Sequence, residues 1–134
     1  MVEQYGHLDA SNKLTDLKQQ IKNAILSGEI ADCDYAEPYR RKTAIDFVSD
    51  AFNGKAASNL ARLKYDNVGK LIQTLKDDYV LVNNNGKAFR NAHIKQSYLL
   101  LRIQELQWAA IVLEYRERER EEQREIREQI REEE

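Results

Sequence analysis

Side chains that could act as metal ligands or nucleophiles are few in this sequence and lie far apart. The two histidines, His7 and His93, are separated by most of the chain, and Cys33 is the single cysteine. These residues match none of the recognised metal-ligand spacings. Cys33 lies between Asp32 and Asp34, whose carboxylates disfavour the thiolate that a nucleophile needs. The sequence therefore predicts neither a metal centre nor a reactive thiol.

Acid–base catalysis and phosphate binding have equally little support. Asp77 and Asp78 are adjacent, but neighbouring carboxylates are common on solvated helix faces and do not by themselves make a catalytic pair. Gly54, Gly69 and Gly86 stand alone, and neither GxGxxG nor GxxxxGK[ST] occurs. We expect a protein that is not an enzyme and that binds no cofactor.

One basic cluster, Tyr39, Arg40, Arg41 and Lys42, has residue types that bind nucleic acid. Arginine and lysine grip phosphate, and an aromatic ring can stack on a base. Three cations at the start of a helix are also common on an ordinary solvated surface. The cluster is therefore a candidate nucleic-acid contact with a simpler alternative.

The charge of the chain is unevenly distributed. Of its 134 residues, 21 are Lys or Arg and 23 are Asp or Glu, and residues 114–134 hold ten Glu and six Arg. The first 113 residues are thus close to neutral, with no overall field that would attract nucleic acid or an anionic membrane. The end of the chain is solvated throughout.

The sequence also indicates a compartment. A single cysteine fits a reducing cytosol, and the N-terminal MVEQYGHLDASNK lacks the basic start and apolar run of a secretory signal. No stretch approaches the ~18 apolar residues that a membrane span needs. We expect a cytoplasmic protein, which would reach a membrane only through parts outside this chain.

Apolar residues at helical spacing predict the elements that hold these side chains. The first helix is expected over residues 12–27, ending at Gly28, and residues 29–37 read as a linker. Pro38 marks the start of a second helix, which Asn53-Gly54 either ends or interrupts with strain.

A third helix is expected from Asp66 or Asn67 to about residue 82, followed by a turn at residues 83–86. From about residue 91 onward no Gly or Pro occurs, so the rest of the chain can form one helix. The predicted fold is all-α, a small helical bundle from which a long, charged C-terminal helix extends.

This last helix carries two apolar faces. One stripe contains Leu99, Ile103, Leu106, Ala110 and Leu113, and nearly the opposite side contains Leu101, Trp108, Val112 and Tyr115. Such a helix is either central to the bundle or shared with a second molecule. We expect a homodimer whose interface is formed by Leu101, Trp108, Val112 and Tyr115, the opposite stripe being the alternative.

After Tyr115 the apolar content falls to Ile126 and Ile130. Pairs such as Glu114–Arg118 and Glu117–Arg120, at spacings of four and three residues, support an exposed helical rod. The chain therefore divides into an N-terminal helix and linker (1–36), a helical core domain (37–113) and a charged connector helix (114–134).

Four sequence motifs resemble one known family. These are AFNG at residues 51–54, KYDNV at 64–68, SYLLLRIQEL at 97–106, and EYRERERE followed by EQREIREQIREEE at 114–134. They are similar to the SNIPE-associated domain, the acronym meaning surface-associated nuclease inhibiting phage entry. The resemblance covers residues 51–134, and residues 1–36 depart from the family pattern.

The resemblance implies a domain that lies upstream of a GIY-YIG endonuclease in bacterial anti-phage proteins. The sequence contains no GIY and YIG pair, so nuclease activity would reside in another domain. By this resemblance the helix after Glu114 is the connector between a sensing domain and a nuclease.

Three functions from different classes follow. The first and favoured one is a non-catalytic recognition and oligomerisation module whose ligand is a phage or host protein. The second is a DNA-binding helical domain that uses Tyr39, Arg40, Arg41 and Lys42. The third is a structural coiled-coil spacer, which would have no compact core.

Overall fold

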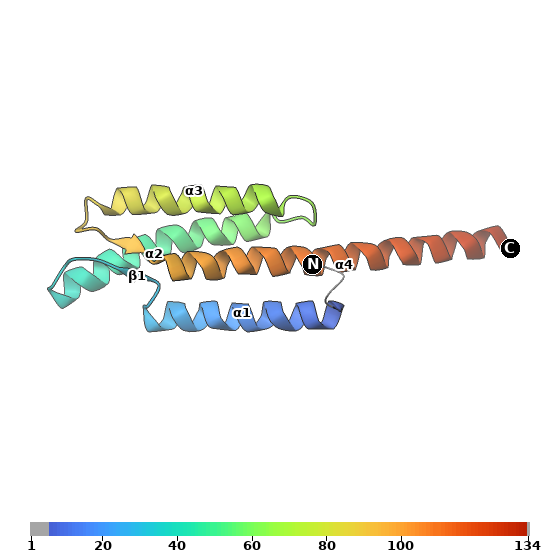
Figure 1. The fold of residues 1–134 in the computed structure, drawn as a ribbon, viewed down its shortest axis with the longest axis horizontal. Coiled ribbons are helices and arrows are strands. Elements are labelled where there is room, and N and C mark those ends of the chain that lie inside the picture. The colour runs from blue at the N-terminus through green and yellow to red at the C-terminus, as the bar shows by residue number, and fades with distance from the viewer. Residues whose placement is uncertain (1–5, 134) are drawn as a thin grey trace.

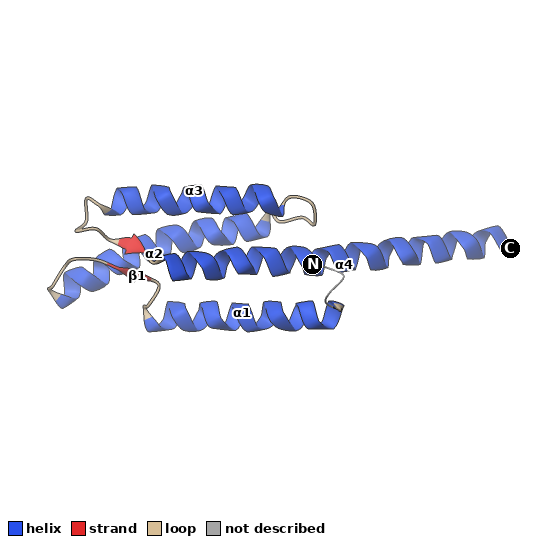
Figure 2. Ribbon diagram, in the orientation of Figure 1, coloured by secondary structure: helices blue, strands red, loops and turns tan. Residues whose placement is uncertain are grey.

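Four helices and one two-stranded antiparallel sheet form the part of the chain that the computed structural model describes, residues 6–133 (Figure 1, Figure 2). The elements are α1 His7–Ser27, β1 Ala31–Asp32, α2 Pro38–Ala61, α3 Val68–Gly86, β2 His93–Ile94 and α4 Gln96–Glu133. α4 lies between α1 on one side and the α2–α3 pair on the other, and its C-terminal part projects beyond the bundle (Figure 1). The predicted all-α class with a long charged C-terminal helix is confirmed.

Local chemistry sets the ends of the first two helices. α1 ends at Ser27, as predicted, and Gly28 follows it with φ of 72°, in the left-handed region that favours glycine. α1 begins at His7, earlier than the predicted residue 12. α2 begins at Pro38, where the Glu37 carboxylate accepts hydrogen bonds from the backbone N–H groups of Tyr39 at 3.0 Å and Arg40 at 2.9 Å. α2 then continues without a break through Gly54.

The predicted turn at residues 83–86 is wrong, because α3 continues through Gly86. The Asn83 side chain binds β2 instead of making a turn: its Oδ1 accepts from the Ile94 N–H at 2.8 Å, and its Nδ2 donates to the Ile94 carbonyl at 3.4 Å. The chain reverses later, at Arg90 and Asn91, which have φ of 51° and 56°. Asn83, a residue type common in turns, thus makes a tertiary contact instead.

Residues 29–37, which were expected to form a linker, take part in the core. Ala31 pairs with Ile94 and Asp32 pairs with His93 in the β1–β2 sheet. Ile30 and Cys33 are buried, with exposed fractions of 2% and 5%. The sheet also delays the start of the last helix from the expected residue 91 to Gln96.

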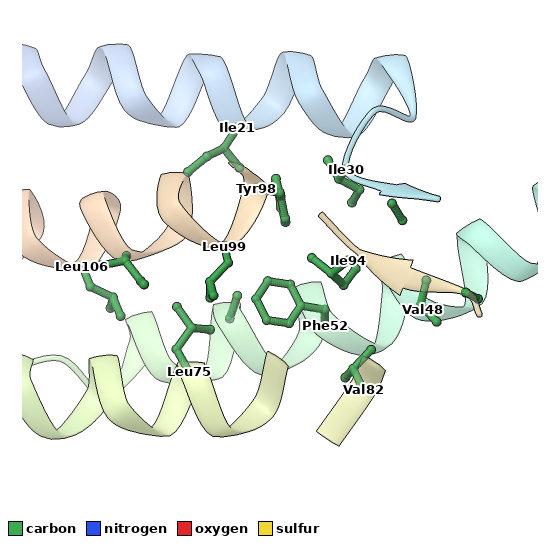
Figure 3. Close-up of a cluster of buried hydrophobic side chains, with 14 of the residues drawn as sticks. Ile21, Ile30, Val48, Phe52, Leu75, Val82, Ile94, Tyr98, Leu99 and Leu106 are labelled. Atoms are coloured by element: carbon green, nitrogen blue, oxygen red, sulfur yellow. The ribbon is translucent and has the colours of Figure 1, made fainter. Parts of the chain in front are cut away.

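The main core lies where α2, α3, the small sheet and α4 meet (Figure 3). Phe52 is completely buried at its centre and makes edge contacts with Tyr98 and Tyr79, whose ring centroids lie 6.0 Å and 6.3 Å away. Leu75 and Leu106 close the core from α3 and α4. Within residues 6–133, no helix combines the length and the apolar composition needed to cross a membrane.

Both apolar faces of α4 are used within the chain. Leu99, Ile103 and Leu106 belong to the main core, whereas Val112 belongs to a second cluster with Ala10 of α1, against which Trp108 and Tyr115 pack. Leu101 packs against the main core instead. Of the two alternatives for a two-faced helix, α4 takes the central position. Leu101, Trp108, Val112 and Tyr115 thus pack within the chain, and the homodimer expected through them stays a prediction.

Candidate interaction groove

A buried polar network fixes the rotation of α4 against α2. The Arg102 guanidinium donates to the Tyr98 hydroxyl at 3.0 Å and to Glu105 Oε1 at 2.9 Å, and its Nη2 lies 3.3 Å from Asn53 Oδ1. The Tyr98 hydroxyl in turn donates to Asn53 on α2, and Lys18 on α1 reaches Glu105 Oε2 at 3.4 Å. Burial raises the pKa of Tyr98, which keeps its hydroxyl protonated as a donor. The network therefore links three helices through α4.

Two hollows lie side by side along the outer surface of α2. The first has a volume of about 320 Å³ and is lined by Tyr35, Tyr39, Arg40, Thr43, Ala44, Phe47 and Phe89. The second has a volume of about 520 Å³ and is lined by Phe47, Val48, Ala51, Lys55, Leu81, Val82, Asn84, Asn85, Ala88 and Phe89. Since Phe47 and Phe89 line both hollows, the two hollows adjoin at this ring pair, and together they are called here the α2 groove.

Large apolar side chains are exposed along the α2 groove. Tyr39 is 76% exposed, Phe47 55%, Leu81 48% and Phe89 44%. Phe47 and Phe89 contact each other where the two hollows adjoin, with ring centroids 5.3 Å apart. Contiguous exposed apolar surface of this kind marks interaction sites in soluble proteins. The groove is the candidate site that the geometry supports best.

The structure separates the four residues of the predicted nucleic-acid contact. Tyr39 and Arg40 line the α2 groove. Arg41 instead pairs with Asp32 at 2.5 Å and donates to the Cys33 carbonyl at 2.9 Å, while Lys42 pairs with Asp46 at 2.6 Å. The cluster therefore gives no continuous basic track along a surface.

Each of these two ion pairs shifts the pKa of one partner in the direction that keeps it charged. The Cys33 backbone N–H and the Arg41 guanidinium hold the pKa of Asp32 below its ordinary value. The Asp46 carboxylate raises the pKa of Lys42. Both cations are thus partly neutralised by partners beside them and are less available to a phosphate.

The central aromatic residues of the groove, Phe47 and Phe89, were not among the predicted site residues. Phe47 falls far from the direction of Ile45, Val48 and Phe52 at 100° per residue. That offset was a usable signal of an outward-facing aromatic. Phe89 follows α3 in a turn, where no periodicity reports which way a side chain points.

The opposite end of the molecule is the charged rod of α4. The predicted pairs Glu114–Arg118 and Glu117–Arg120 are present, at 3.4 Å and 3.6 Å. His7 at the start of α1 contacts Glu119 at 2.9 Å and stacks on Tyr115. α4 is supported by α1 up to this level, and beyond it Ile126 and Ile130 are 54% and 53% exposed.

Comparison with known proteins identifies the family. Neither the comparison with curated proteins nor the comparison with solved structures gives a match. The model of the SNIPE associated domain matches residues 3–117. The match includes α1, which was expected to depart from the family pattern, and it stops before most of the charged rod, whose motif was expected to belong to it. With most of its length covered, the chain belongs to the SNIPE-associated domain family.

Proposed function

We propose that this chain is a non-catalytic recognition and connector module of a bacterial anti-phage protein. In this proposal the α2 groove receives a phage or host protein in the cytoplasm, and α4 holds a GIY-YIG nuclease or similar effector at a fixed place. The single observation behind it is that α4 is one continuous helix, Gln96–Glu133, which is both the centre of the bundle and the projecting rod. The start of α2, which lines the groove, and the projecting end of α4 lie at opposite ends of the molecule (Figure 1).

A rigid path joins the two ends. A partner in the α2 groove contacts α2, and α2 is tied to α4 by the hydrogen bonds of Asn53 with Tyr98 and Arg102. Beyond the bundle, the residues after Tyr115 extend α4 by about 27 Å. An effector attached there would keep its distance and orientation relative to the bound partner.

The alternatives receive less support. DNA binding is less favoured because Arg41 and Lys42 already pair with the neighbouring carboxylates of Asp32 and Asp46. A pure coiled-coil spacer would lack the packed core around Phe52. A homodimer through Trp108, Val112 and Tyr115 would first require α1 to leave α4, and it is not part of the proposal.

The connector role is tested by measuring the stiffness of α4. Spin labels are attached at Ser58→Cys on α2 and Gln129→Cys on the rod, in a Cys33→Ser background. Pulsed electron paramagnetic resonance should give a narrow distribution of the distance between the two labels. The matched control, which adds Glu117→Gly and Arg118→Gly, should broaden it because glycine weakens a helix interior by about 1 kcal/mol per residue. A distribution in the parent as broad as in the control would refute a rigid connector.

The anti-phage role is tested in the bacterium that encodes the chain. Phage plating is compared between the natural allele, a deletion and Phe47→Ser, which removes an exposed groove residue. We expect plating to rise in both altered strains for at least one phage of a diverse panel. Equal plating of every phage on the natural and deleted strains would refute the role.

A further inference from the structure

The lining of the α2 groove follows one stripe of a helix. Among its α2 residues, Arg40, Ala44, Phe47, Ala51 and Lys55 recur every three or four positions, and Tyr39, Thr43 and Val48 lie beside them. From Tyr39 to Lys55 the stripe is about 24 Å long. That length matches about four turns of a helix lying along the groove.

Backbone hydrogen bonding favours a helical occupant over an extended one. The walls of the groove come from α2, from the end of α3 and from the turn with Phe89, and the helix backbones already bond within themselves. An extended peptide would meet no strand edge here and would bury its own amide groups unpaired, at about 1–3 kcal/mol each. A helix satisfies its backbone internally and can place apolar anchors in the hollows.

Charge selects the kind of helix. The two charged residues that line the hollows, Arg40 and Lys55, are both cations and lie near opposite ends of the groove. Between them the lining is apolar or uncharged, with Phe47 and Phe89 in the middle. The complement is an apolar helix face that carries a carboxylate near each end.

Carboxylates next to the groove disfavour a nucleic acid. Glu37, Asp46 and Asp50 lie on or next to α2 and are exposed, so they would repel a phosphate backbone running beside the groove. A short acidic helix can avoid them because it needs only two positive contacts.

We propose that the α2 groove binds an amphipathic α-helix of a protein partner, with apolar anchors in the two hollows and acidic residues that pair with Arg40 and Lys55. The proposal rests on the groove being the recognition surface of the proposed function. It adds the chemical class of the partner, which the family assignment does not specify.

The test selects ligands from a displayed library of helical peptides of roughly 16 residues, the length that spans the groove. The baits are the wild-type chain and the double variant Arg40→Glu/Lys55→Glu. The wild-type chain should enrich apolar residues three or four positions apart flanked by Asp or Glu, and the double variant should enrich Lys or Arg at the flanks. An enriched peptide should bind Phe47→Ser at least about tenfold more weakly in fluorescence polarisation.

A matched control keeps the charge change but moves it off the groove. Lys22→Glu/Lys76→Glu alters two exposed lysines on α1 and α3, and it should select the same acidic helices as the wild-type chain. Circular dichroism of every bait checks that the helices remain. No enrichment, or flanks that ignore the charge of residues 40 and 55, would overturn the proposal.

Fluorescent oligothymidylate is the second probe. Salt-sensitive binding that Phe47→Ser abolishes would assign the groove to single-stranded nucleic acid and overturn the helix proposal. The outcomes separate this proposal from the proposed function. A failed selection together with raised phage plating on Phe47→Ser would reject the helical partner and retain recognition by the groove, whereas unchanged phage plating on Phe47→Ser would reject both.

Discussion

Replacing Glu105 with leucine should destabilise the bundle strongly, because it leaves Arg102 as an uncompensated buried cation. Arg102 and Glu105 are 8% and 4% exposed, and their charged atoms are 2.9 Å apart. Breaking one partner of a buried ion pair costs about 3–5 kcal/mol. Arg102 retains its bond to the Tyr98 hydroxyl at 3.0 Å, so we expect a loss near the lower limit, about 3 kcal/mol in the free energy of unfolding.

The double variant Arg102→Met/Glu105→Leu is the decisive control for this experiment. Removing both charges abolishes the need to compensate either one, so the double variant should recover most of the lost stability. Urea unfolding followed by circular dichroism measures the wild-type chain, both single variants and the double variant, with equal slopes confirming a comparable transition. A loss below about 1 kcal/mol in Glu105→Leu, or a double variant as unstable as the sum of the singles, would refute the reasoning.

Three further predictions follow from single contacts. Gly86→Ala should lose about 1–3 kcal/mol in urea unfolding, because its Cβ would lie 1.7 Å from the Ala92 carbonyl oxygen. Gly54→Ala, which meets nothing within 4 Å, should gain about 0.5–1 kcal/mol, and equal effects at the two glycines would contradict the packing. Burial raises the folded pKa of Tyr98, so its stabilising contribution is complete below the ordinary tyrosine pKa and is lost as pH rises above it. Stability should therefore fall less steeply at alkaline pH in Tyr98→Phe than in the wild-type chain, and parallel curves would exclude this origin. Ala10→Glu places a carboxylate at a position that is 0% exposed and should separate α1 from α4. The fluorescence of the single tryptophan, Trp108, should then shift to the red, and an unchanged spectrum would show that α1 stays in place.

Helices with one buried stripe could be predicted from the sequence. Gly28 and Pro38 mark helix ends through backbone preferences that need no tertiary partner. The prediction of a turn at residues 83–86 was wrong, because the side-chain amide of Asn83 forms hydrogen bonds with the backbone of Ile94. The prediction of a linker at residues 29–37 was also wrong, since a strand of two residues is too short to show periodicity.

Only part of the lining of the candidate groove was predicted from the sequence. Tyr39 and Arg40 were singled out from their residue types, but as part of a nucleic-acid cluster with Arg41 and Lys42. Whether a cation is available or already paired depends on carboxylates such as Asp32, whose distance is fixed only by the folded chain. Phe89 reaches Phe47 through the turn after α3, a contact between residues that no local pattern connects.

The sequence by itself determined that the chain is helical, that its last helix has two apolar faces, and that this helix ends in a charged rod. These properties follow from periodicity and composition, which act within one helix at a time. Only the tertiary structure decided that α1 covers the second face of α4, that Arg102 and Glu105 are buried in one network, and that an apolar groove stays open along α2. The physical reason is that an amphipathic pattern states which side of a helix must be buried, whereas the neighbour that buries it is set by packing across the whole chain.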